Sequence, residues 1–158
     1  MKHFITTGLV LLTALFSVQA QLPVLKSYYE LKEALINSDA TSASVQAAEF
    51  GKTAANTDIK AVPGNSQDAV KEIQKKLIAD ATCIAATKEI GKQREYFANL
   101  SLNMYALAKQ EKLSDQAIYQ AYCPMKKMYW LSSEKNIRNP YYGKMMLTCG
   151  SITNTINP

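Results

Sequence analysis

Residues 70–107 read VKEIQKKLIADATCIAATKEIGKQREYFANLSLNMYAL, and apolar side chains recur in them every three or four positions. Such spacing places the apolar side chains on one face of an α-helix. The pattern weakens between Thr87 and Gly91, so it predicts two helices separated by a break. The two predicted faces consist of Val70, Ile73, Leu77, Ala81 and Ile84, and of Ile90, Phe97, Leu100, Met104 and Leu107.

The same spacing predicts two earlier helices, over residues 23–36 and 40–56. Pro23 fits a first helical turn, because its missing N–H has no partner there. Residues 37–39 can end one helix and cap the next, and Asn65 with Asp68 resembles a capping pair for the third. The predicted apolar faces are Val24, Tyr28, Leu31 and Leu35, and Val45, Ala48, Ala55 and Ile59.

Four amphipathic helices with short connections predict an antiparallel four-helix bundle over residues 23–112, so the chain is expected to be mostly α. The pattern changes after Ser114, where β-forming aromatic residues occur among prolines. We therefore expect residues 115–158 to form a compact C-terminal tail, with room for a short β-hairpin, packed on the bundle. Trp130 is expected in the core, and Cys83 is expected to be a small buried residue beside the face of the third helix.

The first 20 residues have the three parts of a secretory signal peptide. Lys2 and His3 are basic, residues 4–16 are largely apolar, and Val18-Gln19-Ala20 supplies small residues for cleavage after Ala20. The apolar part is interrupted by threonines and is short for a membrane span, which disfavours an anchor. We expect an exported, periplasmic protein whose single domain is residues 21–158, with no membrane insertion of the mature chain.

Composition after cleavage restricts the possible activities. The mature chain has 17 basic and 13 acidic residues, a net charge of +4, and its lysines are scattered along the sequence. This distribution is typical of a solvated surface, and no nucleic-acid partner is expected. The one histidine of the sequence lies in the signal, which excludes Ser-His-Asp and Cys-His catalysis in the mature chain. We therefore do not expect an enzyme.

Sulfur is concentrated between residues 123 and 149 of the tail. Thiolates and thioethers are soft donors that select Cu(I) over hard cations. If a strand continued through Cys123-Pro124-Met125, that thiol and thioether would share one face. Two structural alternatives remain, a Cys123–Cys149 disulfide in an oxidising compartment and plain packing of the methionines. The six sulfur-bearing residues are Cys123, Met125, Met128, Met145, Met146 and Cys149.

The tail also resembles a bacterial periplasmic domain-of-unknown-function family, whose members occur alone or at the C-terminus of adaptor proteins of heavy-metal efflux pumps. The resemblance extends more weakly to residues 28–35 and 93–101. The tail segments that carry it are YCPM (122–125), YWLS (129–132), IRNPYYG (137–143) and MLTCG (146–150).

This resemblance implies copper or related heavy-metal handling, with a periplasmic efflux adaptor or another copper-handling protein as partner. Because no histidine lies nearby, the site would consist of sulfur alone, which favours Cu(I) or Ag(I) over Cu(II). We therefore predict a periplasmic accessory protein that binds Cu(I). The alternative is a non-metal interaction module with a structural Cys123–Cys149 disulfide. The candidate metal ligands are Cys123, Met125 and Cys149, with Met146 or Met128 as a further donor.

Overall fold

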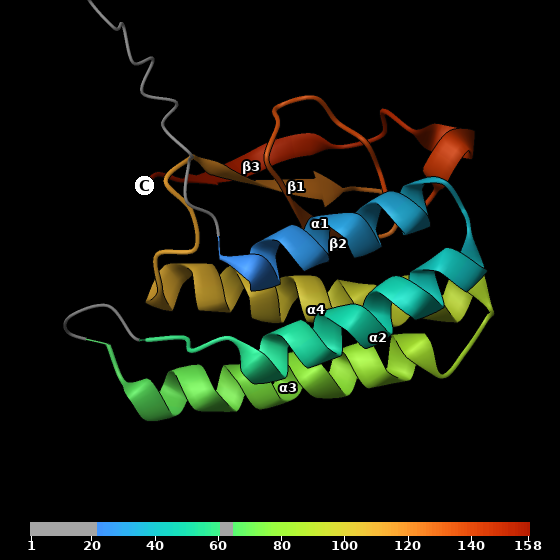
Figure 1. Ribbon diagram of the computed structural model, residues 1–158. Helices are drawn as coiled ribbons and strands as arrows, with labels where there is room; N and C mark the ends of the chain where they lie inside the picture. Colours follow the sequence, from blue (N-terminus) through green and yellow to red (C-terminus); the bar gives the residue numbers. More distant parts are fainter. Residues whose placement is uncertain (1–21, 61–64) are drawn as a thin grey trace, which may run out of the picture.

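The computed structural model describes residues 22–60 and 65–158, so the expected signal peptide and its cleavage site lie outside the described residues. Four α-helices come first and a small β-sheet follows them (Figure 1). The prediction of a mostly α protein with a compact tail is confirmed. The elements are α1 (Pro23–Ile36), α2 (Ala40–Asn56), α3 (Gln67–Ala85), α4 (Ile90–Gln110), β1 (Ile118–Cys123), β2 (Met128–Ser132), a short 3-10 helix η1 (Gly143–Met146) and β3 (Ser151–Ile156).

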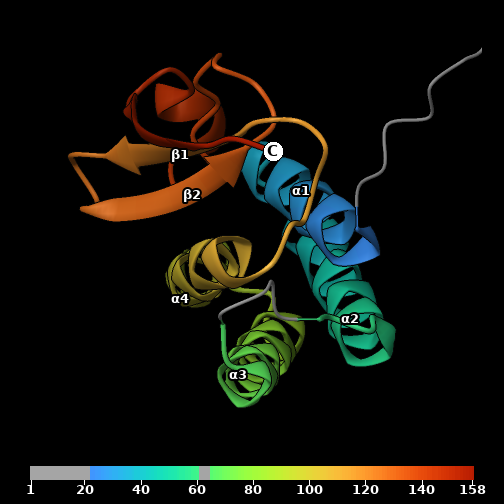
Figure 2. The same ribbon diagram turned by 90° about the vertical axis from the view of Figure 1, so that its left-hand side faces the viewer.

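The helices run antiparallel, and each packs against the next in the chain. Seen nearly end-on in Figure 2, the sheet lies beside α1 and α4, while α2 and α3 lie on the far side of the bundle. Strand β2 packs against α4. The tail therefore closes the side of the bundle where the first and last helices meet. No helix in the described residues is long and apolar enough to cross a membrane.

Two helices begin at residues whose side chains cap them. Asp39 accepts a hydrogen bond from the Ser42 backbone N–H at 2.9 Å, which satisfies one of the free amides at the start of α2. The cap of α3 is Ser66, with its side chain 3.4 Å from the Ala69 N–H. The predicted capping pair of Asn65 and Asp68 is therefore wrong, and Asn65 instead donates its side-chain amide to the Gln110 carbonyl oxygen.

The predicted apolar face of α2 is wrong for its three residues within the helix, whereas Ile59, which follows the helix, is buried as predicted. Val45 is 62% exposed, and Ala48 and Ala55 are also exposed. Because α2 carries alanines on every side, its single β-branched apolar residue is a poor guide to the core. The helix instead buries a face one position out of phase, which comprises Ala43, Ala47, Phe50 and Ala54.

Because Val45 lies in solvent, Val45→Ala should change the free energy of unfolding by less than about 0.5 kcal/mol. Phe50→Ala on the same helix removes a fully buried ring and should cost about 3–5 kcal/mol. Urea titration of both variants measures the difference. A loss above about 1 kcal/mol for Val45→Ala would contradict this orientation of α2.

The cysteine of α3 also differs from its prediction. Cys83 is exposed rather than buried. The buried residues around it in sequence are Ala81 and Ile84, which belong to the core face of α3. Cys83 lies about one residue outside that face, and a helix turns by 100° at each residue. Its thiol is therefore accessible to reagents and must be removed from any test of the other two cysteines.

The tail contains one strand more than the predicted hairpin. All strand pairs are antiparallel, and the order is β2-β1-β3. The hairpin of β1 and β2 is closed by Pro124–Lys127, and β3 returns from the C-terminal end to pair with the other edge of β1. A register shift between Gln120 and Ala121 bends β1 against β3.

Aromatic side chains join the tail to the bundle. The Phe97 ring of α4 stacks on the Tyr28 ring of α1, with centroids 5.2 Å apart. Tyr141 of the tail lies 6.1 Å from Phe97 and 6.0 Å from Trp130 of β2. All four side chains are buried, which confirms that Trp130 is a core residue. The core therefore continues from the helices into the sheet without a break.

Hydroxyl groups satisfy backbone groups on the outer edge of β2. The Tyr28 hydroxyl accepts a hydrogen bond from the Leu131 N–H at 2.9 Å and lies 2.8 Å from the Ser101 hydroxyl. The Tyr141 hydroxyl donates to the Tyr129 carbonyl oxygen. Burial raises the pKa of Tyr28 far above its ordinary value, so this hydroxyl stays protonated. These contacts fix the distance between α1 and the sheet.

Arg94 of α4 forms hydrogen bonds with both the loop before η1 and the end of α1. Its Nε donates to the Pro140 carbonyl oxygen at 2.8 Å, and its Nη2 donates to the Leu35 carbonyl oxygen and the Ser38 hydroxyl, both at 3.0 Å. Gly143 lies beside these groups with a φ of 57°, which favours glycine. One arginine therefore orients the segment that leads into the second half of the tail.

Candidate functional site

Cys123 and Met128 flank the turn that closes the β1–β2 hairpin. Cys123 is the last residue of β1 and is fully buried, and Met128 is the first residue of β2. The two residues are directly opposite each other in the strand register. Side chains of directly opposed residues project from the same face of an antiparallel sheet. The hairpin therefore places a thiol and a thioether side by side.

Cys149 reaches the same place from the loop between η1 and β3. Its N–H donates to the Met146 carbonyl oxygen at 3.1 Å, and its own carbonyl oxygen accepts the Asn139 side-chain amide at 2.6 Å. The next residue, Gly150, has a φ of 147° and lies so close to the sheet that a Cβ there would be 2.7 Å from the Trp130 ring. Glycine is needed at this position because any side chain would collide with the sheet. Its absence of a side chain lets the loop, and with it Cys149, pack against the end of β1.

The two cysteines are thus brought into contact, although 25 residues separate them in sequence. The Cys123 side chain lies close enough to Cys149 to raise the pKa of its thiol. Partial burial raises the pKa of the Cys149 thiol, and repulsion from a Cys123 thiolate and their hydrogen bond raise it further. Both cysteines are free thiols in this structure. The arrangement is a paired-thiol site, which we call the thiol pair.

The exposed methionines are placed differently. Met125 is 63% exposed in the turn after β1, so it does not share a strand face with Cys123 as expected. The physical reason is Pro124, which ends the strand at Cys123 because it lacks the N–H that a ladder requires. Met145 and Met146, in η1, are also exposed. Of the predicted donors, the structure brings together Cys123, Cys149 and Met128, whereas Met125 and Met146 have side chains in solvent.

The candidate metal donors at the thiol pair are the sulfur atoms of Cys123, Cys149 and Met128. Within residues 22–60 and 65–158, no three His, Cys, Asp or Glu side chains gather as metal ligands. Two neighbouring thiols with a thioether beside them suit a soft monovalent ion, which accepts few ligands and prefers sulfur. They do not suit zinc, whose structural sites hold four nitrogen or sulfur ligands. The residues present fit Cu(I) or a disulfide between the cysteines.

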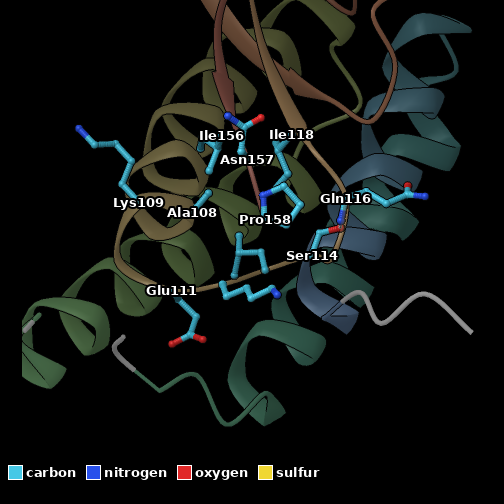
Figure 3. Close-up of a pocket in the computed structure, with 11 residues that line it drawn as sticks. Ala108, Lys109, Glu111, Ser114, Gln116, Ile118, Ile156, Asn157 and Pro158 are labelled. Carbon is cyan, nitrogen blue, oxygen red and sulfur yellow. Dashed lines mark hydrogen bonds between the residues drawn. The ribbon is translucent and has the colours of Figure 1, made fainter. Parts of the chain in front are cut away.

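A hollow lies at the other end of the sheet from the thiol pair (Figure 3), where α4 ends and the chain crosses to β1. Its volume is about 190 Å³. None of its lining residues carries sulfur, so it is chemically separate from the thiol pair. The lining residues are Ala108, Lys109, Glu111, Lys112, Leu113, Ser114, Gln116, Ile118, Ile156, Asn157 and Pro158.

Sequence reasoning missed Arg94 as a residue that positions the site. It connects α1, α4 and the loop that ends in η1, and therefore helps to set the path of the chain toward Cys149. Its sequence signal is weak, since arginine in an amphipathic helix is usually a surface residue. The position three residues before the core residue Phe97 places it beside the buried face of α4.

The fold and site together define a small helical-bundle protein whose C-terminal sheet carries a pair of neighbouring thiols. A family model described as "Protein of unknown function (DUF3347)" matches residues 24–116, more than half of the chain. The chain belongs to this family. The matched region covers the four helices apart from Pro23, the first residue of α1, and ends before β1, so the thiol pair lies outside it. No match was found among curated proteins or among solved structures.

Proposed function

We propose that this chain is a periplasmic accessory protein for heavy-metal handling that binds Cu(I) between Cys123 and Cys149. The observation that carries the proposal is the contact between these two thiols, made by segments distant in sequence. Two thiolates form a linear donor set for a soft monovalent cation, and Met128, opposite Cys123, is the nearest thioether by register. In this proposal Met128 is the further donor.

The features of the leader and of the tail motif support the cellular setting. A signal-like N-terminus favours export, and the tail motif resembles domains that accompany heavy-metal efflux adaptors. In such a setting the protein would accept Cu(I) and pass it to an adaptor or to another copper-handling protein. The mature chain has no histidine, and we propose a binding role rather than an enzymatic one.

The same contact supports a second candidate, an interaction module held by a Cys123–Cys149 disulfide. An oxidising compartment favours this bond, whose formation removes two protons and two electrons from the thiols. The two candidates differ in the number of free thiols in the native exported protein. With Cys83 replaced by serine, a metal-binding protein has two titratable thiols after metal removal, and a disulfide-linked one has none before reduction.

The metal role is tested by competitive Cu(I) titration of reduced protein against a chromogenic chelator. Cys83→Ser is the parent, because the exposed Cys83 is itself a soft donor. The parent should bind about one equivalent of Cu(I), since one pair of thiolates forms one soft site. Adding Cys123→Ser and Cys149→Ser should abolish binding, and adding Met128→Leu should weaken it. Adding Met125→Leu should leave the affinity unchanged, because Met125 lies in solvent.

Binding should also depend on pH with a defined sign. A thiol must lose its proton to ligate the metal, and the pKa of Cys149 is raised. The affinity should therefore fall continuously as the pH is lowered through the neutral range, with release of protons on binding. Equal binding by the parent and the variant without the thiol pair, or no binding by either, would contradict the metal role.

A further inference from the structure

A cavity of about 180 Å³ lies beside the thiol pair, between the start of α4 and the second half of the tail. Met128 forms part of its wall and is also the strand partner of Cys123, so the cavity and the thiol pair are neighbours. An apolar cavity of about 150 Å³ is large enough to take a benzene ring. The lining residues are Gly91, Arg94, Glu95, Lys126, Met128, Tyr141, Tyr142 and Met145.

The apolar part of the lining consists of thioethers and aromatic rings. Met128 and Tyr141 come from the edge of the core, and Met145 is 78% exposed. Methionine adapts its shape to a ligand and makes favourable contacts with aromatic rings. This part of the cavity is therefore suited to a flat apolar group rather than to a sugar or a hydrated ion.

The charged part of the lining has an excess of cations without anionic partners. Arg94 donates its hydrogen bonds to neutral oxygens, which belong to Leu35, Ser38 and Pro140. In the part of the chain that the structure describes, neither Arg94 nor Lys126 forms a salt bridge, and Lys126 lies over the Tyr142 ring at 5.5 Å. Glu95 is the single acidic residue of the lining.

The start of α4 adds to the positive potential. Gly91 is the second residue of the helix, and the N-cap residue, Glu89, makes no side-chain hydrogen bond to the first turn. The first amides of a helix carry the positive end of its dipole. An arginine without a carboxylate partner, a lysine and the start of a helix therefore line one small cavity that also has an apolar side.

We propose that this cavity binds a small aromatic carboxylate, with its ring against Met128, Met145 and Tyr141 and its carboxylate toward Arg94 and Lys126. Carboxylates bound to guanidinium groups gain charge-assisted hydrogen bonds, and Arg94 has its Nη1 group available for one. The cavity shares Met128 with the proposed Cu(I) site, whereas neither cysteine lines it. Binding of the carboxylate therefore does not require the metal.

The test uses protein labelled with ¹³C in the methionine methyl groups and three probes of nearly equal shape. 4-Fluorobenzoate should shift the methyl resonances of Met128 and Met145 and leave that of Met125, in the exposed turn, unchanged. 4-Fluorobenzamide lacks the charge and should bind about tenfold more weakly. 4-Fluorobenzylamine, with the opposite charge, should not bind measurably.

Lys126→Gln should weaken 4-fluorobenzoate binding about two- to fivefold, the effect of one solvent-exposed charge. Lys127→Gln is the matched control, because Lys127 lies next to Lys126 in the same turn but does not line the cavity. Arg94 is left intact because it also holds the tail. Equal affinity for the benzoate and the benzamide, an equal loss in both lysine variants, or no shift of Met128 and Met145 would overturn the proposal.

Discussion

Phe97→Ala should lower the free energy of unfolding by about 3–5 kcal/mol, as the removal of a fully buried ring does. Phe97 is 0% exposed, its ring stacks on the Tyr28 ring with centroids 5.2 Å apart, and the centroid of the Tyr141 ring is 6.1 Å away. Its loss would leave a cavity where α1, α4 and the tail meet. Urea unfolding monitored by both circular dichroism and Trp130 fluorescence would measure the loss in the bundle and in the tail.

Leu102→Ala provides the control on the same helix. Leu102 is 48% exposed, and its truncation should cost less than about 1 kcal/mol. Because Phe97 contacts both layers, the two spectroscopic signals of Phe97→Ala should change together. If Phe97→Ala costs less than about 1 kcal/mol, or if Leu102→Ala costs as much, the proposed orientation of α4 is wrong.

Gly143→Ala should destabilise the protein by about 2–5 kcal/mol, mainly through the tail. The φ of 57° costs an alanine about 1–2 kcal/mol, and forcing extra atoms into a packed site costs about 1–3 kcal/mol more. A Cβ at this position would be 2.6 Å from the Ser38 hydroxyl, 2.7 Å from the Ile36 carbonyl oxygen and 2.9 Å from Arg94 Nη2. The backbone of α1 cannot move aside, so the loop must.

Amide hydrogen exchange would locate this effect. Protection should fall first in η1 and in the loop before it, whose Pro140 carbonyl oxygen accepts a hydrogen bond from Arg94, and less in α2 and α3. Gly91→Ala is the matched control, since a Cβ there would have no atom within 4 Å. Alanine is the better helix former, so Gly91→Ala should be neutral or stabilise by up to about 1 kcal/mol. Similar stability of the two variants would contradict the tight packing at Gly143.

The sequence predicted the helices well because their ends carry local signals. Pro23 and Asp39 begin α1 and α2, and apolar spacing decides the faces of α1, α3 and α4. The face of α2 was mispredicted because alanine gives little contrast between inside and outside. Phe50 held the missing information, since a large ring is costly to expose, and its position alone would have given the correct face.

The sequence predicted which residues could form the candidate site, but not the geometry that brings them together. The concentration of soft sulfur donors in the tail can be read directly from the sequence. The contact between Cys123 and Cys149, however, depends on the pairing of β3 with β1 and on the close approach of Gly150 to Trp130. Neither has a local sequence signal strong enough to predict strand order. The position of Met125 could have been predicted correctly, because Pro124 cannot continue a ladder.

The tyrosine hydroxyls on β2 have a consequence for self-association. An uncovered strand edge offers a row of unpaired amides and carbonyls on which another chain can add a strand, the first step of many aggregates. On β2 the Leu131 amide already donates to the Tyr28 hydroxyl, and the Tyr129 carbonyl already accepts from the Tyr141 hydroxyl. These two backbone groups are therefore not free to pair with another strand. The opposite edge belongs to β3, which is largely exposed. Protection against intermolecular strand pairing is therefore one-sided, and undocking the tail from α1 would also free the Leu131 amide on β2.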